Sequence, residues 1–301
     1  MFKNIYETIG NTPLVELKSE PGSAKIFAKI ESRNPSGSVK DRPVKYIVEA
    51  MLKDGTLEEG GTIIEATSGN TGIALSMIGA ALGIHVMIVM PETMTIERRN
   101  IMKAYGAELV LTPGPDGMQG AVDKAKELSA ELDAPILSQF TREANVQSHV
   151  ETTGQEILKE LDQVDGFVAG FGTGGTVTGV SHVLKKHNPD TQVWAMEPAA
   201  SALISQGQAG PHKIQGLGAN FVPDILDQTD IDKVMTISNE DAIANMVELA
   251  KGQGILAGVS SGANYAAAKL LAKELGQGKQ VVTVLPDTGE RYLSAGFFDA
   301  E

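Results

Sequence analysis

Lys40 is the residue of this sequence whose type and setting most favour covalent chemistry. It lies in the stretch NPSGSVKDR at 34–42, where proline and glycine predict a tight turn directly before a helix. Ser38 and Asp41 have the spacing of a helix capping box. The positive end of a helix dipole and partial burial both lower the pKa of a lysine, which favours the neutral amine that a Schiff base requires. Taken alone, the stretch also fits a surface lysine in a capped turn.

A second stretch, TSGNTG at 67–72, follows a predicted strand and begins a predicted helix. Its hydroxyls, glycine amides and asparagine side chain at a helix N-terminus predict a pocket for an anion such as a carboxylate. The stretch contains no acid or base, so it can bind and orient a substrate but cannot transfer a proton. The structural alternative is a polar helix cap with a glycine for close packing.

A third stretch, GFGTGGT at 170–176, has the glycines and threonine hydroxyls that can wrap a phosphate at a helix N-terminus. Gly170, Gly172 and Gly175 also match the dinucleotide fingerprint G-x-G-x-x-G, and Glu197 follows at the end of the next strand, where a ribose-binding acid is expected. A dinucleotide and a single phosphate therefore both remain open at this point. A nucleoside-triphosphate P-loop is excluded because no Gly-Lys-Ser/Thr closes the turn.

The stretch GVSSG at 258–262 precedes an alanine-rich helix. Paired serines at a helix start are usually caps. Beside a bound heteroaromatic ring, however, a serine hydroxyl can hydrogen-bond a ring nitrogen without adding a full charge, whereas a carboxylate would keep a pyridine protonated.

Short apolar strands alternate with longer helical patterns along most of the chain. Nearly continuous apolar strands between helices predict parallel sheets covered on both faces, with ligands bound beyond the C-terminal strand ends. The alternation restarts after residues 140–150, which predicts two α/β subdomains with a site in the cleft between them. Strands are expected at 26–30, 62–66, 85–90, 108–112, 136–137, 166–169, 192–196, 233–237 and 280–285. Helices are expected at 73–82, 96–105, 146–161, 177–186 and 262–275. Three more are expected: one after Lys40, one that ends at about 132, and one that follows a Ser238–Asp241 capping box and ends at about 251.

Composition narrows the class of protein. The 301 residues carry a formal net charge of −13, which disfavours a nucleic-acid partner. Cysteine is absent, which excludes disulfides and thiolate chemistry, and the five histidines lack zinc-type spacing, so no metal site is expected. The N-terminus lacks a signal-peptide core, and no apolar run reaches the length of a membrane span. A cytoplasmic enzyme is the expectation.

These motifs together resemble the cysteine synthase (O-acetylserine sulfhydrylase) and cystathionine β-synthase family of fold-type II pyridoxal-phosphate enzymes. The resemblance covers essentially the whole chain, because the family order also includes 8–14 near the start, 211–219 in the middle and 285–294 near the end. It implies two subdomains, each a mostly parallel twisted sheet flanked by helices. The smaller is expected at 39–146, and the larger at 1–38 and 147–301.

The resemblance also implies residue roles. Lys40 is similar to the lysine that binds the aldehyde of pyridoxal 5'-phosphate and then acts as the general base on the substrate α-proton. Asn70 resembles the partner of the ring hydroxyl, and Ser260 the partner of the pyridine nitrogen. The phosphate cradle is implied at Gly172, Thr173, Gly174, Gly175 and Thr176. Substrate contacts are implied at Thr67, Ser68, Thr71, Gln139 and Gly216.

The implied reaction is β-replacement, in which O-acetyl-L-serine and sulfide give L-cysteine through an α-aminoacrylate. Asp287-Thr288 departs from the paired serines of many cysteine synthases, and residues 141–145 also differ from the usual pattern. Cystathionine β-synthase activity with homocysteine is therefore the alternative within the family, and a dinucleotide-dependent oxidoreductase is the alternative from another class. The resemblance further implies a homodimer and admits a serine acetyltransferase partner.

Overall fold

A computed structural model of the chain describes residues 1–298. Contacts divide the chain into two compact units. The first comprises Met1–Ile9 with Lys40–Asn145, and the second comprises Gly10–Val39 with the chain from Val146 onward. Each unit is an α/β structure with helices around a mostly parallel sheet, which confirms the predicted fold class. The subdomain boundaries at 39–146 and the cleft stay predictions, and residues 299–301 lie outside the described part of the chain.

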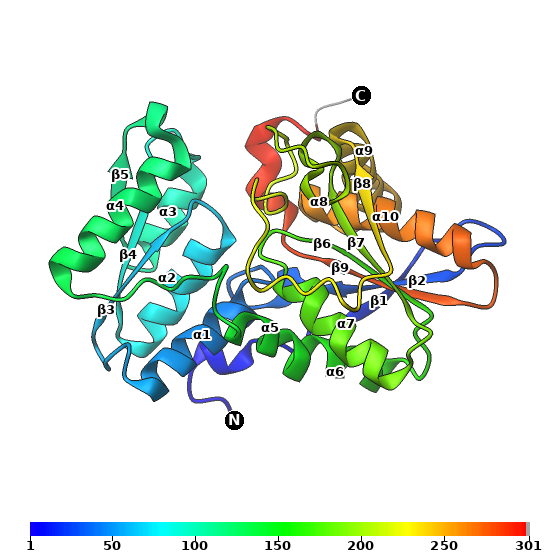
Figure 1. Cartoon of the computed structure of the whole chain (residues 1–301), viewed down its shortest axis with the longest axis horizontal. Coiled ribbons are helices and arrows are strands. Elements are labelled where there is room, and N and C mark those ends of the chain that lie inside the picture. Colours follow the sequence, from blue (N-terminus) through cyan, green and yellow to red (C-terminus); the bar gives the residue numbers. More distant parts are fainter. Residues whose placement is uncertain (299–301) are drawn as a thin grey trace. The chain divides into compact units, whose positions relative to one another are not determined.

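The first unit is built on a parallel sheet in the order β3-β4-β5 (cyan to green in Figure 1). These strands are β3 (Thr62–Ala66), β4 (His85–Pro91) and β5 (Glu108–Thr112). Successive residues of a strand point to opposite faces, so Ile63 and Ile88 pack into one core while Ile64 and Val89 pack into another. The apolar runs of these strands therefore follow from burial on both faces.

The helices of the first unit lie on both faces of this sheet. Helices α1 (Asp41–Asp54), α2 (Asn70–Leu82) and α3 (Ile96–Ala104) pack on one side, and α4 (Gly117–Leu132) covers the other. Left-handed residues follow three of these helices and stop them, namely Gly55, Gly83 and Asp133. The polar stretch at 67–72 joins the end of β3 to the N-terminus of α2.

The second unit has a six-stranded sheet in the order β1-β2-β9-β6-β7-β8. All neighbouring strands are parallel except β1 and β2, which pair antiparallel. The strands are β1 (Leu14–Leu17), β2 (Lys25–Ile30), β6 (Gly166–Gly170), β7 (Gln192–Pro198), β8 (Lys233–Ile237) and β9 (Gln280–Leu285). The central position of β6 brings the glycine-rich stretch after it to the middle of the sheet edge.

Helices cover both faces of this second sheet as well. Two cores result, one that includes Val168 and Ala267 of α10, and one that includes Phe167 and Val180 of α7. The helices are α5 (Ala144–Ser148), α6 (Gly154–Glu160), α7 (Gly175–His187), α8 (Leu203–Gln206), α9 (Asn239–Gln253) and α10 (Val259–Leu275), with a π-helical turn at His149–Thr153 between α5 and α6.

Three sequence expectations about local structure need correction. Strand β1 was not predicted, because a four-residue, mostly exposed edge strand carries little hydrophobic pattern. Residues 136–137 form no strand, since only an isolated bridge joins Ile64 and Ile136. Helix α10 begins at Val259 rather than at 262, because its first turn contains the polar pair Ser260 and Ser261. The predicted Ser238 cap of α9 is confirmed, with Asp241 N donating to Ser238 Oγ at 3.0 Å.

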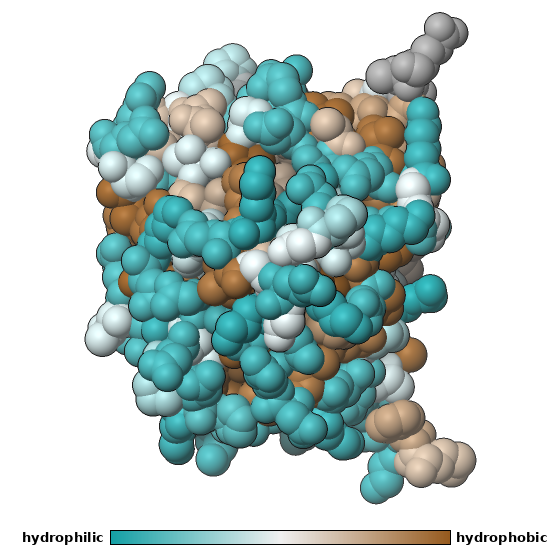
Figure 2. All heavy atoms as spheres, turned by 90° about the vertical axis from the view of Figure 1, so that its right-hand side faces the viewer, coloured by the Kyte–Doolittle hydropathy of each residue, from teal (hydrophilic) through white to brown (hydrophobic). Residues whose placement is uncertain are grey.

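Hydrophilic side chains predominate on the face drawn in Figure 2, with hydrophobic residues interspersed among them. Among residues 1–298, none of the helices combines the length and hydrophobicity that a membrane crossing needs.

Candidate active site

Lys40 belongs to the first unit and immediately precedes α1, where it occupies the N-cap position with helical dihedral angles. The N-cap is Lys40 and not Ser38, which the predicted Ser38–Asp41 capping box requires, so the predicted start of the helix is corrected. Ser38 instead forms a bridge with Asp287, and Val39 N donates to Pro286 O at 2.7 Å. Backbone contacts to the residues that follow β9 therefore hold the residues just before Lys40.

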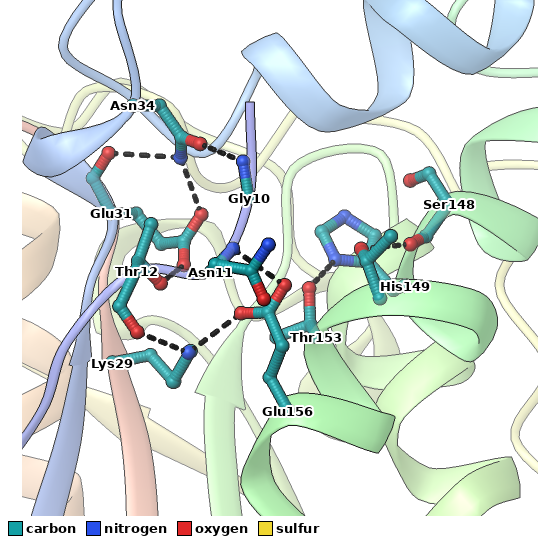
Figure 3. Close-up of polar contacts among 11 residues, drawn as sticks. Gly10, Asn11, Thr12, Lys29, Glu31, Asn34, Ser148, His149, Thr153 and Glu156 are labelled. Carbon is teal, nitrogen blue, oxygen red and sulfur yellow. Dashed lines mark hydrogen bonds and ion pairs between the residues drawn. The ribbon is translucent and has the colours of Figure 1, made fainter. Parts of the chain in front are cut away.

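A buried polar network fixes the turn that leads to Lys40 (Figure 3). The Asn34 side chain accepts from Gly10 N at 2.9 Å and donates to Glu31 Oε2 at 2.7 Å. The other carboxylate oxygen of Glu31 accepts from Thr12 Oγ1 at 2.7 Å. This network ties the segment around Thr12 to the turn at 34–37, since each satisfies polar atoms of the other.

The same network reaches a buried ion pair. Lys29 is fully buried, and its Nζ lies 2.7 Å from Glu156 Oε2 and 2.6 Å from Thr12 O. Glu156 also accepts from Asn11 N at 2.8 Å through its second oxygen. Because both charges have several hydrogen bonds, their burial is compensated, and the segment 10–12 is tied to β2 and α6.

The stretch at 67–72 joins β3 to α2 in the first unit. Thr67 Oγ1 accepts from Gly69 N at 3.2 Å and shapes the turn. The backbone N–H groups of Ser68 and Thr71 have no acceptor among the described residues. Asn70 is the first residue of α2, and Thr71 is buried. The loop thus presents unpaired backbone donors beside hydroxyl groups, which is the arrangement that an anionic ligand needs.

Gln139 lies next to this loop within the same unit. Its Oε1 accepts from Thr71 Oγ1 at 2.6 Å, and its backbone oxygen accepts from Asn145 Nδ2 at 2.9 Å. Ser138, just before it, has a left-handed φ of 59°. The family resemblance implies a substrate contact for both Thr71 and Gln139, and in the structure their side chains are directly bonded to each other.

Glu65, on β3, is buried behind Gln139. Its carboxylate accepts from Ser138 N at 3.1 Å. Burial raises the pKa of the Glu65 carboxyl to about 7, and hydrogen bonding from Ser138 and Gln139 together with Arg142 opposes the rise. A buried carboxyl thus supports the residue that contacts Thr71.

The glycine stretch joins β6 to α7 in the second unit. Gly174 has a φ of +88°, and a Cβ added at Gly172 would lie 2.2 Å from Gly216 O. The backbone N–H groups of Gly172, Gly174 and Thr176 have no acceptor among the described residues. Three unpaired amides at the start of a 13-residue helix form a cradle for a compact, doubly charged anion.

Two further side chains shape this cradle. Asn264 Oδ1 accepts from Gly170 N at 2.7 Å, while its Nδ2 donates to Val284 O at 2.8 Å. His149 lies between two threonines, with Nδ1 2.9 Å from Thr153 Oγ1 and Nε2 3.2 Å from Thr176 Oγ1. His149 and Thr153 are visible in Figure 3. Sequence reasoning assigned His149 no role, because a lone histidine carries no spacing signal.

Ser260 and Ser261 occupy the first turn of α10 and are buried. Ser260 has no side-chain hydrogen-bond partner among the described residues, and Ser261 Oγ is buried without a partner as well. Gly258, which precedes this turn, packs against Asp287, since an added Cβ would lie 2.1 Å from Asp287 Oδ1. Tyr292 OH donates to Asp287 Oδ2 at 2.7 Å. Asp287 therefore packs against Gly258, two residues before Ser260, and its carboxylate is held by the hydrogen bond from Tyr292.

Glu197 does not act as a ribose-binding acid. Its carboxylate accepts from Ile204 N at 3.1 Å and from Ser205 N at 2.8 Å, so it caps the short helix α8. Within residues 1–298, no group of three or more histidine, aspartate or glutamate side chains is arranged to hold a metal ion.

Comparison with known proteins defines the class of enzyme. A family model described as "Pyridoxal-phosphate dependent enzyme" matches residues 5–287. The chain therefore belongs to the pyridoxal-phosphate dependent enzymes, and pyridoxal 5'-phosphate is its cofactor. Within that family it is a fold-type II member of the cysteine synthase group. The dinucleotide interpretation of the glycine stretch is consequently wrong.

Three relatives support the assignment to the cysteine synthase group. Cysteine synthase of Staphylococcus aureus strain Mu50 is 49% identical over 299 residues, which cover 98% of this chain and 96% of the relative. O-acetyl serine sulfhydrylase isoform 3 from Entamoeba histolytica is 44% identical with a TM-score of 0.96, covering 100% of this chain and 92% of that chain. O-acetylserine dependent cystathionine beta-synthase from Helicobacter pylori is 38% identical with a TM-score of 0.93, and covers 99% of each.

The residues present fit this cofactor. The cradle at 172–176 offers unpaired amides and contains no carboxylate that would repel a phosphate. Within residues 1–298 the hydroxyl of Ser260 has no hydrogen-bond partner, which suits a bond to a ring nitrogen. Lys40, Asn70, Thr67, Ser68, Thr71 and Gln139 lie in the first unit, and the glycine cradle, Gly216 and Ser260 lie in the second.

Glu65 is the main buried charged residue beside the candidate site that sequence reasoning missed. A usable signal existed, because Glu65 is a charged residue inside the otherwise apolar strand TIIEA, one residue before the stretch at 67–72. A buried carboxyl needs hydrogen-bond donors, and Glu65 lies near the C-terminal end of its strand, where ligands of α/β sheets bind.

Proposed function

We propose that this chain forms L-cysteine from O-acetyl-L-serine and sulfide by pyridoxal-phosphate dependent β-replacement. The single observation that carries the proposal is the 49% identity to a cysteine synthase over 98% of this chain. Two loops of the structure supply the matching chemistry, because one offers donors suited to a carboxylate and the other offers amides suited to a phosphate.

Lys40 carries the proton chemistry in this proposal. When bound, the cofactor supplies an electron sink that acidifies the substrate α-carbon and assists departure of the β-substituent. Lys40 Nζ binds the cofactor aldehyde and, once released, accepts the proton from the substrate Cα. No carboxylate or histidine in 34–42 other than Asp41 competes for this task, and Asp41 is buried in the first turn of α1.

The glycine stretch holds the phosphate. Backbone amides of Gly172, Thr173, Gly174, Gly175 and Thr176 are proposed as the cradle, with the threonine hydroxyls as further donors. His149 supports Thr176, because its Nε2 lies 3.2 Å from Thr176 Oγ1. The backbone oxygen of Gly216 lies so close to Gly172 that any side chain at position 172 would clash with it.

Asn70 and Ser260 are proposed to contact the ring, Asn70 at the ring hydroxyl and Ser260 at the pyridine nitrogen. A neutral hydroxyl at the nitrogen does not hold a full positive charge there. That property suits β-elimination better than transamination, since it limits how strongly charge is withdrawn into the ring.

Thr67, Ser68, Thr71 and Gln139 are proposed to bind the α-carboxylate of the amino acid. The unpaired amides of Ser68 and Thr71 donate to the carboxylate, and the Thr71–Gln139 bond of 2.6 Å fixes the orientation of both side chains. Such positioning places the α-proton and the leaving group for reaction and accounts for selection of an amino acid.

A direct assay tests the proposal. Purified holoenzyme with O-acetyl-L-serine and sulfide should yield L-cysteine, and Lys40→Ala should lose at least about a thousandfold in kcat/KM. Retention of wild-type turnover by Lys40→Ala, or failure of the wild type to form cysteine, would contradict it.

A second candidate is cystathionine formation from homocysteine. It is favoured by the 38% identity to the O-acetylserine dependent cystathionine beta-synthase over 99% of the chain. Competition between sulfide and homocysteine for limiting O-acetyl-L-serine ranks the two reactions, and replacement of O-acetyl-L-serine by serine identifies the leaving group.

The family resemblance alone supports three finer proposals. These are a cytoplasmic location, a homodimer and docking to a serine acetyltransferase. Sedimentation of the purified protein, alone and mixed with a serine acetyltransferase, tests the last two.

A further inference from the structure

Strands β6 and β9 are neighbours in the second sheet, and they stop pairing before they end. Their parallel ladder reaches the pair Val168–Thr283, whereas the strands themselves extend to Gly170 and Leu285. In a continued parallel register, Gly170 N would donate to Val284 O. The last two residues of both strands are therefore the place where these strands separate.

The side chain of Asn264 lies between the separated strand ends. Asn264 belongs to α10 and is 1% exposed. Its Oδ1 accepts from Gly170 N at 2.7 Å, and its Nδ2 donates to Val284 O at 2.8 Å. A backbone N–H can only donate and a carbonyl can only accept, so these two partners fix the orientation of the amide. One side chain thus replaces a direct bond between the strands and satisfies both backbone groups.

The separation coincides with the topological switch point of the sheet. Strands β7 and β8 follow β6 in sequence and extend the sheet on one side, while β9, the last strand, lies on the other side of β6. In open α/β sheets, ligands bind beyond the C-terminal strand ends at the point where the strand order reverses. Asn264 therefore keeps two strands apart where the topology favours a ligand.

Asn264 also connects two candidate cofactor contacts of the second unit. Gly170, to which it is bonded, begins the glycine stretch at 170–176. Ser260 lies four residues before Asn264 in α10, so both side chains are on the same face of that helix. The Asn264 amide therefore ties the start of the phosphate cradle to the helix that carries Ser260.

We propose that Asn264 is a positioning residue for pyridoxal 5'-phosphate, which sets the separation between the phosphate cradle and Ser260 by bridging the ends of β6 and β9. The inference rests on the proposed function in one respect, the contact of Ser260 with the ring nitrogen. Asn264 acts through Gly170 and α10, since its amide oxygen and nitrogen are both bonded to backbone groups.

Thr283 offers a matched control. It is fully buried on β9, and its Oγ1 donates to Val168 O of β6 at 2.7 Å. Thr283→Val therefore removes a buried side-chain bond between the same two strands, at the pair where their ladder still holds. An effect that Thr283→Val shares with Asn264→Ala would report a general loosening of the contact between β6 and β9.

The experiment measures the dissociation constant of pyridoxal 5'-phosphate, by titration of the full-length apoenzyme followed by absorbance. Asn264→Ala should raise this constant at least about tenfold, because two backbone groups lose their common partner and the strand ends shift. Thr283→Val should bind the cofactor like the wild type. Because the readout is cofactor affinity, a wild type that forms no L-cysteine would contradict the proposed function alone.

A double-mutant cycle with Ser260→Ala tests whether Asn264 acts by placing Ser260. Ser260→Ala alone should weaken cofactor binding about threefold to tenfold. In the Asn264→Ala background the same change should have little further effect, since Ser260 no longer lies at the separation from the cradle that the cofactor requires.

Four results would overturn the inference. Two concern single variants: wild-type cofactor affinity in Asn264→Ala, or in Ser260→Ala. The third is an equal loss of affinity in Thr283→Val and Asn264→Ala, and the fourth is multiplication of the two effects in the double variant. Should Asn264→Ala not fold, Asn264→Ser takes its place, because one hydroxyl cannot span both backbone groups. It should weaken cofactor binding about threefold to tenfold, and unchanged affinity would then reject the proposal.

Discussion

The stretches at 67–72 and 170–176 occupy equivalent places in two different sheets, and they solve anion binding differently. Each follows a parallel strand, leads into a 13-residue helix and leaves backbone amides unpaired. The first adds side chains, with Thr71 bonded to Gln139, and with Ser138, just before Gln139, bonded to the buried Glu65. The second is nearly all backbone, closed by the contact between Gly172 and Gly216 O.

The difference teaches which ligand each stretch suits. Backbone amides at a helix start offer several equivalent donors, which match the three oxygens of a phosphate group. Oriented side chains discriminate shape and direction, which matches an amino-acid carboxylate that must be placed for proton transfer. A change in one stretch should therefore impair one ligand and spare the other.

The largest separation is expected for Gly172→Ala. The added Cβ would lie 2.2 Å from the backbone oxygen of Gly216, so the cradle must shift. Affinity for pyridoxal 5'-phosphate should fall at least about a hundredfold, as expected for overpacking of about 3 kcal/mol. Titration of apoenzyme with cofactor, followed by absorbance, measures this. Gly252→Ala, whose Cβ would meet only Glu248 Cγ at 3.8 Å, should retain wild-type affinity. Equal affinities in the two variants would remove the distinction between backbone and side-chain recognition.

The next effect concerns the carboxyl behind the first stretch. Burial raises the pKa of Glu65 from 4.5 to about 7, so the folded protein holds a proton that the unfolded chain releases between these values. The contribution of Glu65 therefore favours folding below about pH 4.5 and declines as pH rises to about 7, by about 3 kcal/mol in total.

Chemical denaturation followed by circular dichroism at several pH values measures this contribution as the difference between wild type and Glu65→Gln. The variant lacks the titrating group, so its advantage over the wild type should grow as pH rises from 4.5 to 7. A difference independent of pH would show that Glu65 does not titrate in this range.

A smaller effect is expected for Thr71→Val, which keeps the shape of the side chain but removes its bond to Gln139. The dissociation constant of L-serine should rise about tenfold with cofactor affinity unchanged, because a buried acceptor is left unpaired. Thr56→Val, at an exposed position of the same unit, is the control. Loss of cofactor by Thr71→Val would mean that the two stretches are not functionally separate.

The smallest change is expected for Ser260→Ala. Loss of one neutral hydrogen bond should weaken cofactor binding about threefold to tenfold. Because Ser261 is also buried in the same turn, Ser261→Ala is the matched control and should leave cofactor affinity and absorbance as in the wild type.

The sequence predicted the fold well where burial on both faces imposes long apolar runs, as in β3, β4 and β9. It failed at helix starts. The first turns of α2 and α10 are polar, so their hydrophobic pattern begins one turn late, and Asn70 and Ser260 were placed in loops rather than in helices.

For the candidate site, the motifs predicted the residues that donate hydrogen bonds to ligands. They did not predict the residues that hold those donors in place. Thr71 and Gln139 are far apart in sequence, and their bond became visible only in the structure. Glu65, His149 and Asn264 lie in strands or helices and support site residues through side-chain bonds to backbone or hydroxyl groups. Such partners depend on which elements become neighbours, and a local pattern does not specify that.

Borohydride reduction of the purified holoenzyme, followed by peptide mass spectrometry, tests the central assignment most directly. Reduction fixes the cofactor to the lysine that binds it. The account predicts that the modified peptide carries the label on Lys40, the residue that ends the NPSGSVK turn. A label on another lysine, or a holoenzyme that keeps its cofactor without any reducible bond to Lys40, would contradict it.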